Sequence, residues 1–158
     1  MPARFTRDGD GNITRVVDAN GSNWNFGFDR ARRLVTKTDP LGNTTALEYN
    51  TRQLISKVTM PSASLSLTYN AAGGLIRRLY SDGVDLKYTY NKNGQLTAAN
   101  GVTLGYDAAR RIVASNGIGV GRDAGGRIAS VTMGPGLVVT YAYNDRGLLS
   151  RVRDWTGG

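Results

Sequence analysis

The first residues whose spacing could do chemistry are Asp8, Asp10 and Asn12, because oxygen side chains at alternate positions begin the calcium loop of an EF-hand. That loop also needs glycine at its sixth position and a bidentate glutamate at its twelfth. Here Ile13 and Ala19 stand at those positions. We therefore expect no metal site at this segment and no cofactor in the chain.

The residue types of most enzyme active sites are scarce. The 158 residues include neither cysteine nor histidine, which excludes a thiolate nucleophile, an imidazole base and the usual zinc ligands. Glu48 is the single glutamate beside eleven aspartates. Most of those aspartates stand in turn-forming sequences, whereas acid–base catalysis needs a carboxyl with a raised pKa in a pocket. We therefore predict no catalytic residues and a protein that is not an enzyme.

Most of the acidic residues belong to a repeat. Eight nine-residue blocks align without gaps and begin near residues 5, 26, 47, 67, 88, 104, 120 and 141. Each block reads apolar, small or polar, aromatic, then Asp or Asn, with Leu or Ile five residues later. The Asp/Asn positions are Asp8, Asp29, Asn50, Asn70, Asn91, Asp107, Asp123 and Asn144, and the aromatic residues before them are Phe28, Tyr49, Tyr69, Tyr90, Tyr106 and Tyr143. Self-similarity at steps of 16 to 21 residues indicates a repeat architecture.

Each repeat predicts two strands and two turns. The segment that enters a block alternates between apolar and polar residues, as in Tyr88 and Tyr90 around Thr89, which is the period of a strand with one apolar face. The short Asp/Asn side chain can bond the backbone two residues on and so start a turn. Glycine follows three residues later in five blocks and supplies a positive φ. Arg32, Gln53 and Arg110 stand there in the other three.

The second turn of each repeat varies in length. The two 16-residue steps contain Asn100-Gly101 and Asn116-Gly117, and Asn-Gly favours a two-residue type I′ hairpin turn. The longer steps carry the linkers DANGS, DPLGN, MPSAS, YSDGV and MGPGL, which we expect to form longer loops. The predicted fold is all-β, a run of consecutive antiparallel hairpins with about sixteen strands and almost no helix.

Open sheet edges invite aggregation. We therefore expect the curled strip to close on itself, the first repeat against the eighth, as a barrel or a flattened barrel. The shared apolar face would point inward as the core, and the Arg, Lys and Thr side chains would point outward. The alternative is association of copies through their strand edges.

The blocks resemble the YD repeats of the RHS (rearrangement hot spot) family, whose units look like Y-x-Y-D-x-x-G-R-L. YTYNKNGQL, YAYNDRGLL and LGYDAARRI are near matches, whereas Arg7 and Arg122 replace the aromatic residue in two blocks. The resemblance covers residues 5–154 and indicates a single YD/RHS-repeat domain over residues 1–158. It implies hairpins that form a long β-strip curled into a hollow shell.

The function implied by this resemblance is that of a non-catalytic structural module, a fragment of an RHS-type shell. Such shells enclose the toxin of bacterial polymorphic toxins and toxin-complex subunits, and teneurin-like surface proteins use similar repeats in adhesion. The partners implied are other repeats of a longer parent chain or an enclosed toxin domain. Asp39-Pro40-Leu41-Gly42 matches the short form of the family's self-cleavage motif, but it lies in an ordinary linker between repeats, so we expect no cleavage there.

The resemblance implies a secreted or cell-surface protein. The N-terminus has no apolar segment of a signal peptide, so we expect a cytoplasmic protein if the chain is complete. The last residues, Asp154 to Gly158, align with the linker DANGS, which favours a fragment of a longer array. Strands of about six or seven residues are shorter than the ~9–11 that cross a bilayer, so we expect no membrane insertion.

Two other functions remain open from the sequence. The aromatic ladder, with Tyr88, Tyr90 and Tyr141, could serve a carbohydrate- or protein-binding adhesion module of the same fold. The net charge of +8 could serve polyanion binding through a basic face. We expect no specific nucleic-acid binding, because stacking of bases needs aromatic and cationic side chains on one surface, and alternation places most of them on opposite faces.

Overall fold

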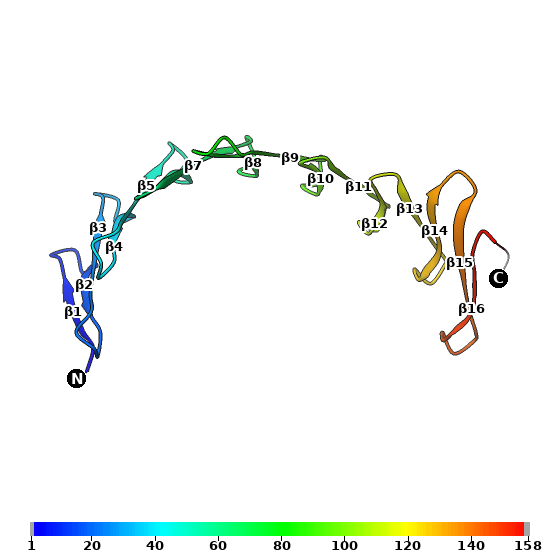
Figure 1. Ribbon diagram of the computed structural model, residues 1–158, viewed down its shortest axis with the longest axis horizontal. Helices are drawn as coiled ribbons and strands as arrows, with labels where there is room; N and C mark the ends of the chain where they lie inside the picture. The colour runs from blue at the N-terminus through cyan, green and yellow to red at the C-terminus, as the bar shows by residue number, and fades with distance from the viewer. Residues whose placement is uncertain (1, 157–158) are drawn as a thin grey trace. The chain divides into compact units, whose positions relative to one another are not determined.

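The computed structural model describes residues 2–156, which form sixteen strands and no helix. The strands are hydrogen-bonded in sequence order, each antiparallel to the next, so the predicted all-β run of consecutive hairpins is confirmed (Figure 1). The strands are β1 (Arg4–Arg7), β2 (Ile13–Val17), β3 (Asn23–Phe28), β4 (Leu34–Thr38), β5 (Thr44–Tyr49), β6 (Ile55–Met60), β7 (Ala63–Tyr69), β8 (Leu75–Tyr80), β9 (Asp85–Tyr90), β10 (Leu96–Ala99), β11 (Val102–Tyr106), β12 (Ile112–Ser115), β13 (Ile118–Arg122), β14 (Ile128–Gly134), β15 (Leu137–Tyr143) and β16 (Leu149–Arg153).

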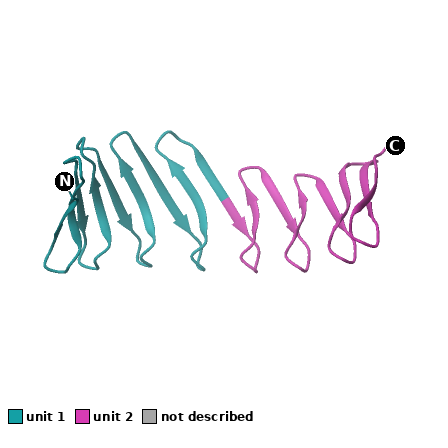
Figure 2. Cartoon of the chain, turned by 90° about the horizontal axis from the view of Figure 1, so that it is seen from below, with its two compact units in different colours: residues 1–87 teal, residues 88–158 magenta. Residues whose placement is uncertain are grey.

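The chain divides into two compact units, residues 1–87 and 88–158, with the boundary inside β9 (Figure 2). Within each unit the turns lie at the ends of the strands, in two rows on opposite sides of the sheet, because each strand runs antiparallel to the next. We call the turns at the Asp/Asn of each block the block turns; they span residues 8–12, 29–33, 50–54, 70–74, 91–95, 107–111, 123–127 and 144–148. The turns on the other side are the linker turns.

The two faces of the sheet differ in composition within each unit. Residues directly opposite on neighbouring strands share a face, and one face is apolar, with the opposed pairs Val16 and Trp24, Val58 and Leu65, Val120 and Val131, and Tyr141 and Val152. The other face carries Thr, Ser, Ala and charged residues, as in Ser130 opposite Thr140. The separation is incomplete, because Lys37 lies opposite Phe26 and Arg78 opposite Leu67 on the apolar face.

The sheet is a single layer with no core. None of residues 2–156 is buried, and large apolar side chains stay open to solvent, with Phe5 60% and Leu149 54% exposed. The expected core of inward-facing aromatic residues is therefore wrong. Those side chains are only partly covered, by neighbours on the same face.

The expected closure is also wrong. β1 and β16 are the two ends of the strand order, and no ladder joins them in the described residues. The physical reason lies in the side chains. A barrel of sixteen strands leaves a wide lumen that Val, Thr, Ser and Gly cannot fill. Closure would therefore pair the edges without burying the apolar face.

The linker turns correct a third expectation. Only DANGS, DPLGN and YSDGV form longer loops, in which the first residue donates its N–H to the carbonyl oxygen of the fifth (Asp18 to Ser22, Asp39 to Asn43, Tyr80 to Val84). MPSAS and MGPGL instead make two-residue turns, because Met60 pairs with Ala63 and Gly134 with Leu137. The predicted type I′ turns are confirmed, with both residues of each Asn-Gly at positive φ. Gly157 and Gly158 of the terminal segment lie outside the described residues.

The fourth residue of every block turn adopts a left-handed backbone. Glycine occupies this position in five of these turns, as at Gly73 with φ 84°. Arg32, Gln53 and Arg110 adopt the same conformation, with φ of 61°, 64° and 63°. A side chain in this region costs about 1 kcal/mol relative to glycine. Three block turns therefore tolerate strain that the other five avoid.

Replacement of Gln53 by glycine should stabilise the sheet by about 0.5–1 kcal/mol, because it removes that strain and breaks no side-chain hydrogen bond of Gln53 within residues 2–156. Gly73→Ala, at the same position of the next block turn, should destabilise it by a similar amount. Urea unfolding followed by circular dichroism measures both. Equal midpoints for Gln53→Gly and the parent chain would contradict the assignment of strain.

Candidate functional site: the junctions between repeats

Each block turn is built around the side chain of its Asp or Asn. In the first, Asp8 donates its N–H to the Asn12 carbonyl oxygen at 3.0 Å and accepts the Gly11 N–H at 3.1 Å. Its Oδ1 accepts the N–H groups of Asp10 and Asn12 at 3.0 and 2.9 Å. The ladder shifts register between Thr6 and Arg7. This is a hairpin turn with a glycine bulge, in which the carboxylate satisfies two loop N–H groups.

The same bonds recur in the other seven block turns, where Oδ1 of the Asp or Asn accepts the N–H of the residue four positions later. These acceptors are Asp29, Asn50, Asn70, Asn91, Asp107, Asp123 and Asn144. Asp18 and Asp39 do the same in two linker turns. All eight Asp/Asn positions of the repeat thus begin block turns.

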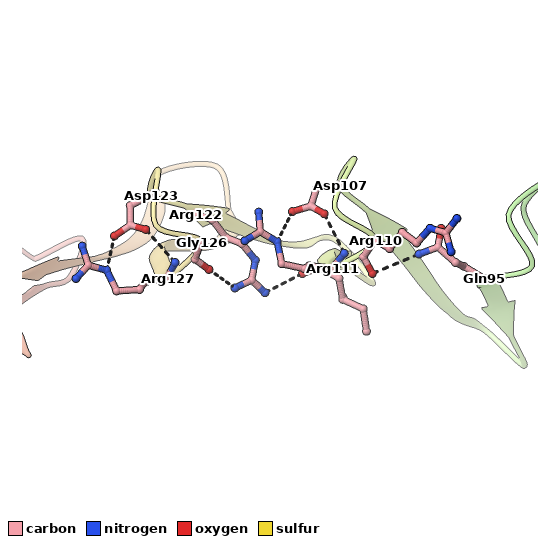
Figure 3. A network of polar contacts seen from close by, with 9 residues as sticks. Gln95, Asp107, Arg110, Arg111, Arg122, Asp123, Gly126 and Arg127 are labelled. Atoms are coloured by element: carbon pink, nitrogen blue, oxygen red, sulfur yellow. Dashed lines mark hydrogen bonds and ion pairs between the residues drawn. The ribbon is translucent and has the colours of Figure 1, made fainter. Parts of the chain in front are cut away.

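The choice between Asp and Asn follows the residue four positions later. An Asp leaves a second charged oxygen, and a donor side chain meets it in four block turns. Arg33, Arg111 and Arg127 donate from Nε to Asp29, Asp107 and Asp123 at 2.8, 2.8 and 2.7 Å (Figure 3 draws the last two), and Asn12 donates to Asp8 at 2.9 Å. An Asn instead precedes Leu54, Gly74, Leu148 or the acceptor Gln95. The pattern is visible in the sequence, where Arg or Asn follows each Asp of the repeat by four residues.

These bonds lower the pKa of three block-turn carboxyls, those of Asp29, Asp107 and Asp123, below the usual value. The N–H and then the side chain of Arg33 lower the pKa of Asp29, and the N–H of Arg111 is the main cause at Asp107. The guanidinium of Arg127 is the main cause of the lowered pKa of Asp123. Each carboxyl therefore stays ionised in mildly acidic solution.

In six blocks an aromatic residue ends the strand that leads into the block turn, and in four of these a tyrosine connects that strand to the repeat before it. Their hydroxyls donate to the backbone carbonyl of the Leu or Ile that follows the previous block turn. The pairs are Tyr49 to Leu34 (2.7 Å), Tyr69 to Ile55, Tyr106 to Leu96 and Tyr143 to Ile128 (2.8 Å each). This bond explains why the motif keeps both a tyrosine and a Leu or Ile at fixed spacing.

Arg122 takes the place of that tyrosine in the seventh block. It donates from Nη2 to the Ile112 carbonyl at 3.3 Å and from Nη1 to the Gly126 carbonyl at 3.0 Å (Figure 3). Arg7, the other replacement, donates to the Gly11 carbonyl at 2.7 Å. Arg122 thus reaches the same kind of carbonyl that a tyrosine reaches in four other repeats, and this departure from the pattern preserves the junction.

Cationic side chains complete two of the junctions. The Arg33 guanidinium lies 4.5 Å from the ring centroid of Tyr49, and that of Arg127 lies 4.4 Å from Tyr143. Each arginine therefore connects the Asp of its own block turn to the tyrosine of the next repeat. Cation–π contacts at exposed sites contribute about 0.5–1 kcal/mol.

Side chains also join neighbouring block turns directly, along the side of the sheet on which these turns lie. Arg52 donates to the carbonyls of Asn70 and Ala71 at 2.7 Å each. Arg32 pairs with Asp10 at 3.2 Å, and Gln95 donates to the Arg110 carbonyl at 3.3 Å (Figure 3). Asp10 is therefore engaged by an arginine.

These contacts are better suited to holding neighbouring hairpins together than to catalysis or metal binding. No group of three or more acidic residues that could hold a metal ion occurs in residues 2–156. Asp39 to Gly42 make an ordinary linker turn with an exposed Leu41. In the part of the chain that the structure describes, no helix is long and apolar enough to cross a membrane.

Comparison with known proteins agrees with this geometry. The family model described as RHS Repeat matches residues 7–44, so the resemblance found in the sequence is confirmed. A search of curated proteins found no match.

Three solved structures share the fold. They are a complex named TcdB2-TccC3-Cdc42 (18% identity, 95% of this chain, TM-score 0.54), TcdB2-TccC3 without the hypervariable C-terminal region (17%, 95%, 0.52) and the Photorhabdus luminescens Tc holotoxin pore (18%, 93%, 0.53). This chain spans about 9% of the length of each matched chain.

Loss of a single tyrosine hydroxyl at a junction should weaken the sheet. Tyr143→Phe removes the bond to the Ile128 carbonyl and should cost about 0.5–1 kcal/mol of unfolding free energy. Tyr141→Phe is the matched control, because Tyr141 lies on the same strand and its hydroxyl forms no hydrogen bond within residues 2–156. Chemical unfolding of the two variants side by side tests this, and equal losses would argue against the junction.

The lowered pKa values predict the response to acid. A carboxyl whose pKa is lower in the folded than in the unfolded chain stabilises the fold above the unfolded pKa, and that contribution is lost as the pH falls through the folded pKa. Stability should therefore be level from about pH 8 to pH 5 and fall below about pH 4.

Asp123→Asn should reduce this acid dependence. Asp145→Asn removes the same charge without breaking an ion pair seen in the described residues and should leave the profile unchanged. Thermal melts across the pH range measure both. If the midpoint of the pH profile of stability lies near neutral pH, groups other than these carboxyls control the pH dependence.

Proposed function

We propose that this chain, which contains an RHS repeat, is a wall segment of an RHS-type shell, part of a longer chain that encloses a toxin or another C-terminal domain. One observation carries the proposal: none of residues 2–156 is buried, although one face of the sheet is apolar in both units. A single-layer sheet of this kind needs something to cover that face.

The junctions support the role of a wall. A backbone ladder binds each hairpin to the next, and several junctions add a tyrosine hydroxyl or a contact of Arg32, Arg52 or Gln95. These contacts join neighbours only, so the array can grow by adding repeats without a central core. The module is structural, and the scarcity of acid–base and metal-binding groups supports a protein without catalytic activity.

The similar structures are toxin-complex chains, and this chain covers about 9% of their length. We infer a bacterial parent chain with further repeats, exported to the outside or the surface of the cell. In this proposal the apolar face covers the enclosed domain, and the polar face meets water. The partners are accordingly the remaining repeats and that domain.

The adhesion alternative has one specific place in its favour. Trp24, Lys37, Asp39, Asn43 and Thr45 line a shallow hollow in the first unit, an aromatic ring beside polar groups. The Lys37 ammonium already lies over that ring, 4.7 Å from its centroid. A sugar that stacks on the Trp24 ring would have to displace the Lys37 ammonium. This contact therefore favours the wall proposal over the adhesion alternative.

The full product of the gene that encodes these residues tests the proposal. We expect further repeats around them and a second domain that resists protease in the native full-length protein. The same domain expressed alone is the control and should be digested readily. A reading frame without further repeats, or a second domain digested equally fast with and without them, would contradict the wall.

A further inference from the structure

The polar face of the first unit contains a hollow of about 360 Å³ above β1 and β2. Arg4, Thr6, Arg15 and Asp18 are among the residues that line it. Thr6 lies directly opposite Arg15 in the ladder, and Arg4 precedes Thr6 by two residues on the same strand. The two arginines are thus diagonal neighbours on one face, roughly 7–8 Å apart.

Within residues 2–156 both arginines lack an acidic partner, whereas three other cations of this face have one. Lys57 pairs with Glu48, and Arg77 and Lys87 both pair with Asp85. Neither Arg4 nor Arg15 forms an ion pair in residues 2–156. Two positive charges therefore lie beside one hollow without internal neutralisation.

One of the two guanidiniums is held in place. Arg15 donates from Nε to Oδ1 of Asn23 at 2.6 Å, which fixes the plane of the group and leaves both of its Nη atoms to donate elsewhere. The negative charge of Asp18 is partly offset, because its Oδ1 accepts the N–H groups of Asn20 and Ser22 at 2.9 Å each. The hollow therefore favours an anion.

We propose that this hollow binds a tetrahedral oxyanion, a sulfate or phosphate monoester. Guanidinium groups donate two parallel bonds to such an anion, and a dianion can satisfy two of them at once. The Thr6 hydroxyl adds a further donor. The volume falls within the usual range of small-ligand sites, so it leaves room for a group of about the size of one sugar that carries the ester. The site is independent of the wall proposal, which requires no ligand.

Titration of the full chain with sodium sulfate or sodium phosphate, followed by amide NMR signals, tests the site. Chloride keeps the ionic strength constant, and acetate serves as the planar monoanion. We expect saturable shifts centred on Thr6, Arg15 and Gly21 with a millimolar dissociation constant, and clearly weaker binding of acetate. Linear shifts spread over both units, or equal binding of acetate, would indicate diffuse attraction of anions and overturn the proposal.

Variants separate the site from general charge. Arg4→Gln should weaken sulfate binding about tenfold, as loss of a charge-assisted bond predicts. Arg153→Gln is the matched control, because Arg153 lies on the same face at β16, opposite Thr140, and its replacement removes the same charge. It should leave the affinity unchanged, and an equal loss in both variants would refute the site. Arg15→Lys keeps the charge but removes the planar donor pair, so an unchanged affinity would also refute it.

Discussion

The bond from an Asp or Asn Oδ1 to the N–H four residues later is the interaction on which the other features depend. A three-residue hairpin loop exposes backbone donors that no strand can satisfy, and this side chain satisfies two of them. It fixes the turn and the bulge beside it. The bulge sets the register in which the preceding tyrosine meets the carbonyl of the previous repeat. The repeat motif is therefore a description of one turn and its junction.

The structure distributes its stability along the chain rather than in a centre. Because none of residues 2–156 is buried, each hairpin depends on the hydrogen-bonded ladder, on side chains of its own face and on the junctions with its neighbours. Arg33 and Arg127 each stabilise two repeats at once, since each contacts an Asp of its own turn and a tyrosine of the next repeat. A surface with one apolar face and no core is suited to line or cover another body.

The local structure could be predicted from the sequence because its signals are local. Asn100-Gly101 specifies its own turn, and the alternation around Tyr141 specifies its face. The junction partner of Tyr143 could not be predicted, since it depends on a bulge that shifts the ladder by one residue. The predictions of a buried core and of a closed barrel were wrong, because alternation along a strand identifies an apolar face but does not indicate what covers that face. The spacing of four residues between Asp and Arg was visible in the sequence, but only the geometry of the turn shows that the two side chains form an ion pair.

Covalent footprinting of solvent-exposed side chains tests the central claim most directly, that this sheet is a wall whose apolar face is covered in the parent protein. Trp24 and Tyr141 report on the apolar face, and Thr36 and Thr140 on the polar face. In the isolated chain both faces should be labelled. In the full-length gene product, labelling of the apolar face should fall several-fold while the polar face keeps its labelling. Equal labelling of the apolar face in both proteins would contradict the account.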